Sequence, residues 1–191
     1  TKSVVMFGMN DVQRGYYAID NQGSEEHKAW AISQCLINME TLAGMIEEEG
    51  SEVILMTPSV ADERGGDWSK TKNTAGLNDA IGKIADGFFK LAEDKGYGVI
   101  DTYTLTRTIH DKYMDSGVQE MISTDRVHPV QQGYYVLGYN VIRNLFKDSG
   151  LVAQVDIDAN TKTAKTENAT VKGLDVADGK ILYTYLPKAL P

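Results

Sequence analysis

Two short polar motifs contain the residue types that acyl-transfer chemistry needs. Asp125 and His128 are three residues apart, and at this spacing a carboxylate in a turn can fold back onto the imidazole. A neutral histidine accepts a proton from a nucleophile and later returns it to the leaving group, while the carboxylate fixes the tautomer of the ring. The other motif is Gly8-x-Asn10-Asp11, in which the asparagine amide is a suitable donor to the oxyanion of a tetrahedral intermediate. Together the motifs predict an acyl-transfer site.

Strands and helices are expected to alternate around these motifs. The expected strands are 3–7, 53–56 and 98–103, and the expected helices are 24–50, 77–96 and 134–145, with short helical pieces within 104–123. This pattern predicts an α/β fold with a parallel sheet and helices on both faces. Ligands bind beyond the carboxyl ends of the strands in such a sheet. Asn10 follows the first strand, and the loop that carries His128 can reach the same edge.

The pattern changes after Gly150. Segments 152–157 and 180–186 alternate apolar and polar residues, with Asn, Asp, Gly and Lys between them. This alternation is typical of half-buried strands. We therefore expect an α/β domain over residues 1–150 and a small β extension over residues 151–191.

In this order and in this context, the two motifs resemble the third and fifth sequence blocks of the SGNH (GDSL-type) hydrolases, especially bacterial members. The resemblance implies a three-layer α/β/α, flavodoxin-like fold. It implies that His128 is the general base, Asp125 its orienting carboxylate and Asn10 a donor of the oxyanion hole. Gly8 would let the end of the strand turn tightly, and Asp11 is expected to hold the loop through hydrogen bonds.

The chain departs from that family because it has no Gly-Asp-Ser block to supply a nucleophilic serine. Ser59 follows a strand end and is the best internal substitute, Ser69 follows a Gly-Asp pair one place late, and Ser3 is at the wrong end of its strand. We therefore expect a fragment without the first strands of the fold, inactive alone, whose nucleophile lies on another segment. The apolar edge Val4–Phe7 would be covered by that N-terminal segment or by a second copy of the chain.

The favoured function is an SGNH-type esterase acting on a small ester, with an acetylated carbohydrate as the candidate substrate. Arg14, Tyr16 and Tyr17 follow the Asn10 motif and are candidate substrate contacts. The alternative is a catalytically inactive carbohydrate-binding or structural module that uses Tyr16, Tyr17 and Trp68. A weaker alternative is metal-dependent phosphoester hydrolysis through the polar residues of the two motifs, whose ligand set is thin.

The amino-acid composition argues against nucleic acid as a binding partner. The 191 residues include 19 Lys and Arg against 27 Asp and Glu, a net charge of −8, and no basic stripe of the kind that nucleic-acid binders carry is visible. No run reaches the ~18 apolar residues of a membrane span. Cys35 is the single cysteine, so no intrachain disulfide is expected; the compartment stays open, with a secreted or periplasmic location favoured. We expect no metal site, because the three histidines are scattered along the sequence and are not accompanied by cysteine pairs. No other cofactor is expected.

Overall fold

The structure, a computed structural model, describes residues 1–65, 71–113, 122, 124–145 and 153–188. The chain divides into two compact units, Thr1–Phe146 and Lys147–Pro191. The boundary expected at Gly150 lies outside the described residues, and each unit is described by itself below.

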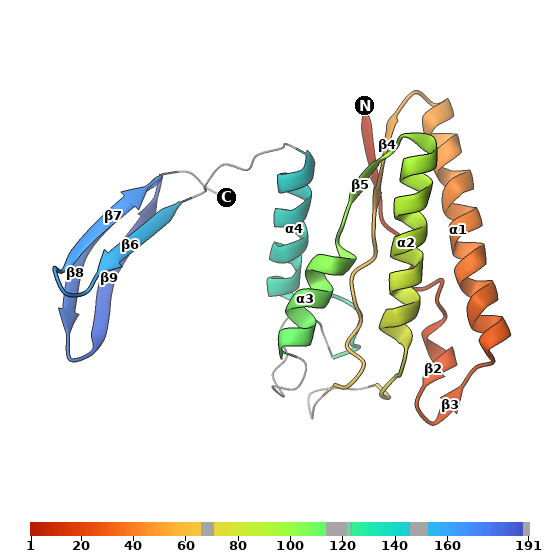
Figure 1. The fold of residues 1–191 in the computed structure, drawn as a ribbon, viewed down its shortest axis with the longest axis horizontal. Coiled ribbons are helices and arrows are strands. Elements are labelled where there is room, and N and C mark those ends of the chain that lie inside the picture. The colour runs from red at the N-terminus through yellow and green to blue at the C-terminus, as the bar shows by residue number, and fades with distance from the viewer. Residues whose placement is uncertain (66–70, 114–121, 123, 146–152, 189–191) are drawn as a thin grey trace. The chain divides into compact units, whose positions relative to one another are not determined.

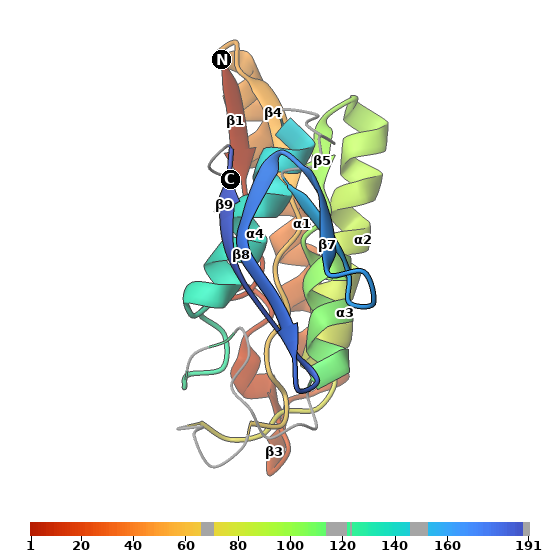
Figure 2. The same ribbon diagram turned by 90° about the vertical axis from the view of Figure 1, so that its left-hand side faces the viewer.

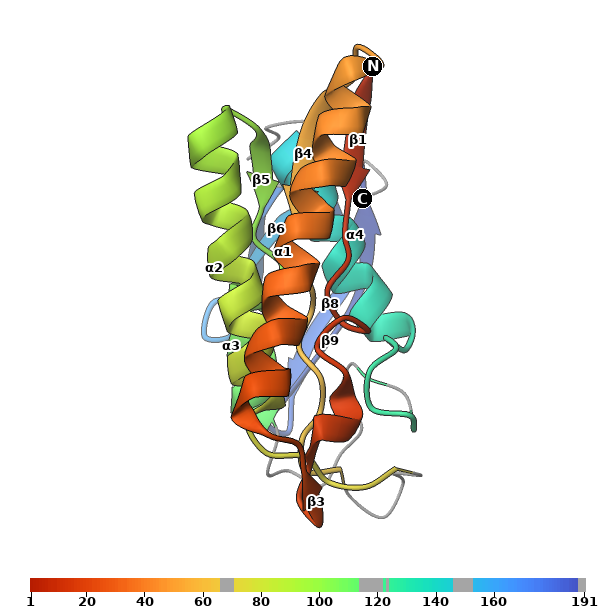
Figure 3. The same ribbon diagram turned by 90° about the vertical axis from the view of Figure 1, so that its right-hand side faces the viewer.

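The first unit is built on a parallel sheet of three strands. β1 (Lys2–Val5), β4 (Glu52–Met56) and β5 (Gly98–Ile100) lie in the order β1-β4-β5, with Val4 opposite Ile54. The helices α1 (Glu25–Glu48) and α2 (Leu77–Lys95) cover one face, and α4 (Gln131–Leu145) covers the other (Figures 1 and 3). The helix α3 (Tyr103–Tyr113) follows β5. The predicted α/β architecture, a parallel sheet between helical layers, is confirmed.

The ends of α1 follow from local sequence. The hydroxyl of Ser24 accepts a hydrogen bond from the main-chain nitrogen of His27 at 3.2 Å, and two glutamates occupy the first turn. Such a cap satisfies a main-chain donor that has no partner within the helix, and acidic residues there complement the helix dipole. After the helix, Gly50 adopts a φ of 77°, a left-handed conformation that glycine reaches without strain.

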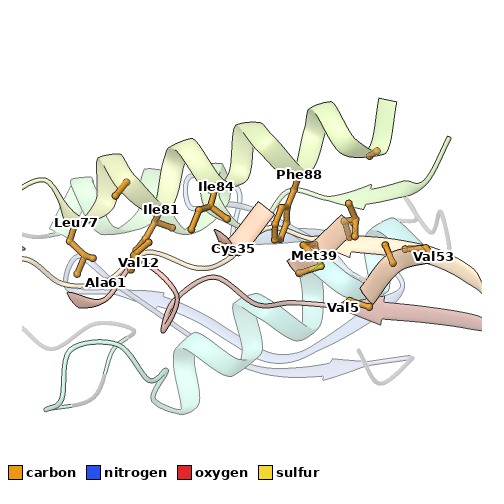
Figure 4. Packing of buried hydrophobic residues seen from close by; sticks show 14 of the residues in the cluster. Val5, Val12, Cys35, Met39, Val53, Ala61, Leu77, Ile81, Ile84 and Phe88 are labelled. Carbon is orange, nitrogen blue, oxygen red and sulfur yellow. The ribbon is translucent and has the colours of Figure 1, made fainter. Parts of the chain in front are cut away.

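The main core lies between the sheet and the α1–α2 layer, as Figure 4 shows. Phe88 and Ile84 of α2 pack there with Met39 and Cys35 of α1, and all four side chains are buried. Burial, with a smaller contribution from the carboxylate of Asp11, raises the pKa of the Cys35 thiol to about 12. A thiol in this environment is inert and belongs to the packing.

A second, smaller cluster lies on the opposite face of the sheet. Ile54 and Met56 of β4 alternate with the strand residues that face the main core, and they pack with Leu137 and Val141 of α4. Successive side chains along a strand point to opposite faces of the sheet. Both faces of β4 are therefore covered, which is why the apolar run of this strand is continuous.

The segment between β1 and α1 contains structure that hydropathy did not predict. The short helix η1 (Arg14–Tyr16) leads into a small hairpin formed by β2 (Tyr17–Ala18) and β3 (Asn21–Gln22). Ala18 forms an isolated antiparallel bridge with Thr74, and the nitrogen of Ala75 donates to the oxygen of Tyr17. The hairpin thus joins the loop before α2.

The outer side of β1 has no neighbouring strand within the described part of the chain. The exposed fractions of Val4, Met6 and Phe7 are 38%, 41% and 58%. Cover for this edge, by another segment or by a second copy, stays a prediction.

The second unit consists of antiparallel hairpins (Figure 2). β6 (Gln154–Asp158) pairs with β7 (Thr163–Glu167), and β8 (Ala169–Ala177) pairs with β9 (Lys180–Pro187). The expected strands at 152–157 and 180–186 correspond to β6 and β9, although residue 152 lies outside the described residues. In the described ranges of both units, no helix has the length and apolar character to cross a membrane.

Candidate active site

The loop after β1 is held by close packing. Gly8 has a φ of 120°, and a Cβ atom at this position would lie 3.2 Å from both Ile84 Cγ2 and Pro58 Cγ. The carboxylate of Asp11 accepts a hydrogen bond from the nitrogen of Gly8 at 3.1 Å, and Val12 is completely buried. A larger residue than glycine would meet both backbone strain and side-chain contact here.

Asn10 is at the exposed tip of this loop. It lines a hollow of about 140 Å³ whose walls come from residues 6–11 and from Pro58 and Ser59, which follow β4. Asn10 therefore lies beyond the carboxyl end of β1, beside a space that can receive a small molecule.

The pair Asp125 and His128 is formed in the loop before α4. Oδ1 of Asp125 accepts hydrogen bonds from the main-chain nitrogens of Val127 and His128, each at 3.0 Å, and Oδ2 lies 2.6 Å from Nδ1 of His128. An ionised carboxylate only accepts, so Nδ1 carries the proton and Nε2 is left with a lone pair. The side chain of His128 is 74% exposed, which leaves Nε2 accessible to a reacting group.

The same loop is anchored by Arg126, whose side chain is completely buried. Its Nε donates to the main-chain oxygen of Asp62 at 2.9 Å, and its Nη1 donates to the oxygen of Thr71 at 3.0 Å and to Oδ1 of Asn73 at 2.8 Å. In return, the nitrogen of Asp62 donates to the oxygen of Arg126 at 2.9 Å. Burial lowers the pKa of the Arg126 guanidinium, and the carboxylate of Asp62 opposes that shift.

Arg14, which follows the Asn10 motif in the short helix η1, links this segment to the loop that carries Asp125. Its Nη1 donates to the main-chain oxygen of Asp125 at 2.5 Å, and its Nη2 donates to the hydroxyl of Thr71 at 2.7 Å. Burial lowers the pKa of Arg14, against the attraction of the carboxylates of Asp125 and Asp62. The structure thus brings the loop after β1 and the loop before α4 to the same end of the sheet.

The three candidate substrate contacts have different surroundings. Arg14 is engaged with the Asp125 loop, as described above. The ring of Tyr16 stacks on His27, with 5.7 Å between ring centroids. The expectation that Tyr17 contacts substrate is wrong, because its side chain is only 3% exposed and packs in the main core. Trp68, proposed for carbohydrate binding, lies outside the described residues.

Ser59 lies between the two loops, because it lines the hollow beside Asn10 and also a small apolar depression next to Val127 and Pro129. In the described part of the chain, no serine hydroxyl makes a hydrogen bond to His128. Ser69 lies outside the described residues, and Ser3 bonds instead with Ser51 near the start of β4.

Among residues that the structure describes, no group of three or more His, Cys, Asp or Glu side chains is arranged to hold a metal ion.

The residue that sequence reasoning missed is Arg126. Its position inside the Asp-x-x-His motif is the one local signal that could have drawn attention to it. Its partners at 62, 71 and 73 are remote in sequence, and an arginine in a polar loop is ordinarily solvated.

No protein-family model and no curated protein matches the chain. Solved structures do match. BT4096, a gut microbial diltiazem-metabolizing enzyme, is 22% identical with a TM-score of 0.65 over 98% of this chain and 42% of its own. Axe2, an acetylxylan esterase from Geobacillus stearothermophilus, is 20% identical with a TM-score of 0.52 over 74% of this chain and 57% of its own. The chain therefore spans about half the length of these structures, and the likeness shows that it shares their fold.

Proposed function

We propose that the chain carries the histidine, the aspartate and an oxyanion donor of an SGNH-type serine esterase. The observation that carries the proposal is the 2.6 Å contact between Asp125 Oδ2 and His128 Nδ1, with the imidazole exposed. This arrangement holds the ring as a base at Nε2 and stabilises the imidazolium that forms when the ring takes a proton.

The proposed reaction uses these groups in sequence. A serine hydroxyl attacks the ester carbonyl and its proton passes to Nε2 of His128, while the Asn10 amide donates to the oxyanion. As the tetrahedral intermediate collapses, His128 returns the proton to the leaving alkoxide and an acyl-enzyme remains. Water then attacks the acyl-enzyme with the same base, which releases the acid and restores the serine.

The comparisons support this chemistry by fold analogy. Axe2 is an acetylxylan esterase, and a catalytic mutant of that esterase has a serine replaced by alanine. We extend this to the present chain as an acetyl ester of a carbohydrate for the substrate class. The hollow beside Asn10, about 140 Å³, is suited to a small acyl group.

We further propose that the nucleophile is not one of the serines of these 191 residues. The support is the lack of a Gly-Asp-Ser block and the lack, among described serines, of a hydroxyl bonded to His128. Ser59 is the internal competitor, since it lies between the two loops.

A fluorophosphonate probe, followed by intact mass and peptide mapping, tests both proposals. We expect no adduct on the 191-residue chain, and an adduct together with hydrolysis of p-nitrophenyl acetate for a longer form that includes a Gly-Asp-Ser segment. An adduct on Ser59 that disappears in His128→Ala would retain the esterase and refute the external nucleophile. A longer form with neither adduct nor hydrolysis would refute the esterase.

A further inference from the structure

Arg126 combines two features that are rarely found together. Its φ is 72°, a left-handed conformation that residues with a Cβ atom seldom adopt, and its side chain has no solvent exposure. A glycine would make the same turn without strain. The turn by itself therefore does not require arginine, and the reason for the side chain must lie in what the guanidinium contacts.

The guanidinium ties the loop to a separate part of the first unit. Its bonds to Asp62, Thr71 and Asn73, between 2.8 and 3.0 Å, all go to the segments that lead from β4 towards α2. The main-chain bond from Asp62 to the oxygen of Arg126 adds a fourth link. Bonds from a charged donor are stronger than those between neutral groups, so this is a firm anchor.

The anchor acts on the catalytic pair through the backbone. Arg126 stands between Asp125 and the two main-chain nitrogens, of Val127 and His128, to which the Asp125 carboxylate bonds. The imidazole itself is 74% exposed, so it has little packing of its own to fix its orientation. The orientation of the His128 ring therefore depends on the conformation of the loop before α4. That conformation in turn depends on the hydrogen bonds that hold the buried side chain of Arg126.

We infer that Arg126 is a positioning residue, which holds Asp125 in register with Nδ1 of His128 through the anchor at residues 62, 71 and 73. Its effect on ester hydrolysis rests on the proposed function, whereas its effect on the pair does not. Arg14, which bonds to the oxygen of Asp125, supports the same loop from the side of Asn10.

The decisive experiment reads the tautomer of His128 by long-range ¹H–¹⁵N NMR on the full chain, at a pH where the imidazole is neutral. We expect wild type to carry its proton on Nδ1, because the carboxylate accepts from that atom. In Arg126→Gly, which relieves the backbone strain but removes the anchor, we expect a shift towards the Nε2-protonated form that free imidazole prefers. Arg126→Lys should restore part of the wild-type tautomer, since it keeps one buried donor.

The matched control is Lys162→Gly. Lys162 is also basic and left-handed, with a φ of 53°, but it lies in the hairpin between β6 and β7 of the other unit. It should leave the tautomer of His128 unchanged. If Arg126→Gly does not fold, Asn73→Ala takes its place: Asn73 is exposed, and its loss removes one acceptor from the guanidinium. A smaller shift in the same direction is then expected.

Ester hydrolysis is the second measurement, and it is made on the longer form of the protein that includes a Gly-Asp-Ser segment. Misplacing a catalytic base by about 1 Å costs about 10²-fold in rate, so kcat should fall by this order in Arg126→Gly while KM stays within about twofold. Folded Arg126→Gly or Asn73→Ala with the wild-type tautomer would overturn the inference. A shifted tautomer, together with a longer form that includes a Gly-Asp-Ser segment and still hydrolyses no ester, would retain the positioning role and refute the proposed function instead.

Discussion

The loop after β1 and the loop before α4 carry the two halves of the candidate site, and different forces hold them. In the first loop, Gly8 is wedged between Ile84 and Pro58, and Val12 is buried beneath it. In the second, the reactive side chain is exposed, and the loop is fixed by the buried guanidinium of Arg126.

The two loops are therefore expected to be sensitive to different kinds of substitution. The packed loop is sensitive to added volume, because protein interiors have no spare space. The loop held by hydrogen bonds to a buried charge is sensitive to the loss of a partner, because an unpaired buried group is costly.

The largest effect is expected from Asp125→Asn. The amide still accepts from the nitrogens of Val127 and His128 through its oxygen, but its NH₂ group then faces Nδ1 and selects the wrong tautomer. In serine proteases the equivalent change lowers kcat by about 10⁴-fold, and we expect a loss of about 10³–10⁴-fold in ester hydrolysis by the longer form that includes the nucleophile. Thermal unfolding should stay close to that of wild type. Hydrolysis within tenfold of wild type would mean that Asp125 does not act on His128 as proposed.

Gly8→Ala should be the most damaging change of volume. The residue would carry a Cβ at a φ of 120°, 3.2 Å from two side-chain carbons, so we expect a loss of about 2–4 kcal/mol in the free energy of unfolding. Urea denaturation measures it. Gly44→Ala in α1 is the matched control: its Cβ meets nothing within 4 Å, and it should stabilise by about 0.5–1 kcal/mol. Equal effects at the two positions would refute the packing argument.

Asp11→Ala should weaken the same loop less. It removes the 3.1 Å bond from the nitrogen of Gly8 but leaves the packing of Gly8 and Val12 intact. We expect a loss of about 1–2 kcal/mol, measured by the same denaturation. A loss as large as that of Gly8→Ala would show that the loop is held by its hydrogen bond and not by packing.

The elements that could be predicted from sequence are those whose signals are local. α1, α2 and β4 follow from apolar periodicity and from caps, and the contact of Asp125 with His128 follows from a spacing of three residues. The strand β7 was missed because Thr163–Glu167 has one apolar side chain and no hydrophobic face to detect.

The site features that could not be predicted depend on long-range partners. From the sequence, Tyr17 is expected to lie in an exposed loop. In the structure its side chain is buried, and the neighbouring residue Ala18 forms a bridge with Thr74. From the sequence, Arg126 is expected to be a solvated residue of a loop. Hydropathy does not predict the hydrogen bonds that its guanidinium makes to Asp62 and Asn73. Spacing can identify a reactive pair, but the residues that hold the pair are defined only by the fold.

The smallest effect expected is the pH dependence of stability that comes from the buried histidine of α3. His110 of α3 is buried, and burial lowers its pKa, while the carboxylates of Asp62 and Asp111 oppose the shift. The unfolded chain keeps the ordinary value near 6.5, so below about pH 6.5 it binds a proton that the folded protein does not. This contribution to stability is complete above that pH and is lost as the pH falls towards the lowered pKa of His110. His110→Gln should therefore lose less stability than wild type between neutral and mildly acidic pH, as measured by urea denaturation across that range. Parallel curves for the two proteins would show that the titration of His110 does not contribute to the pH dependence of stability.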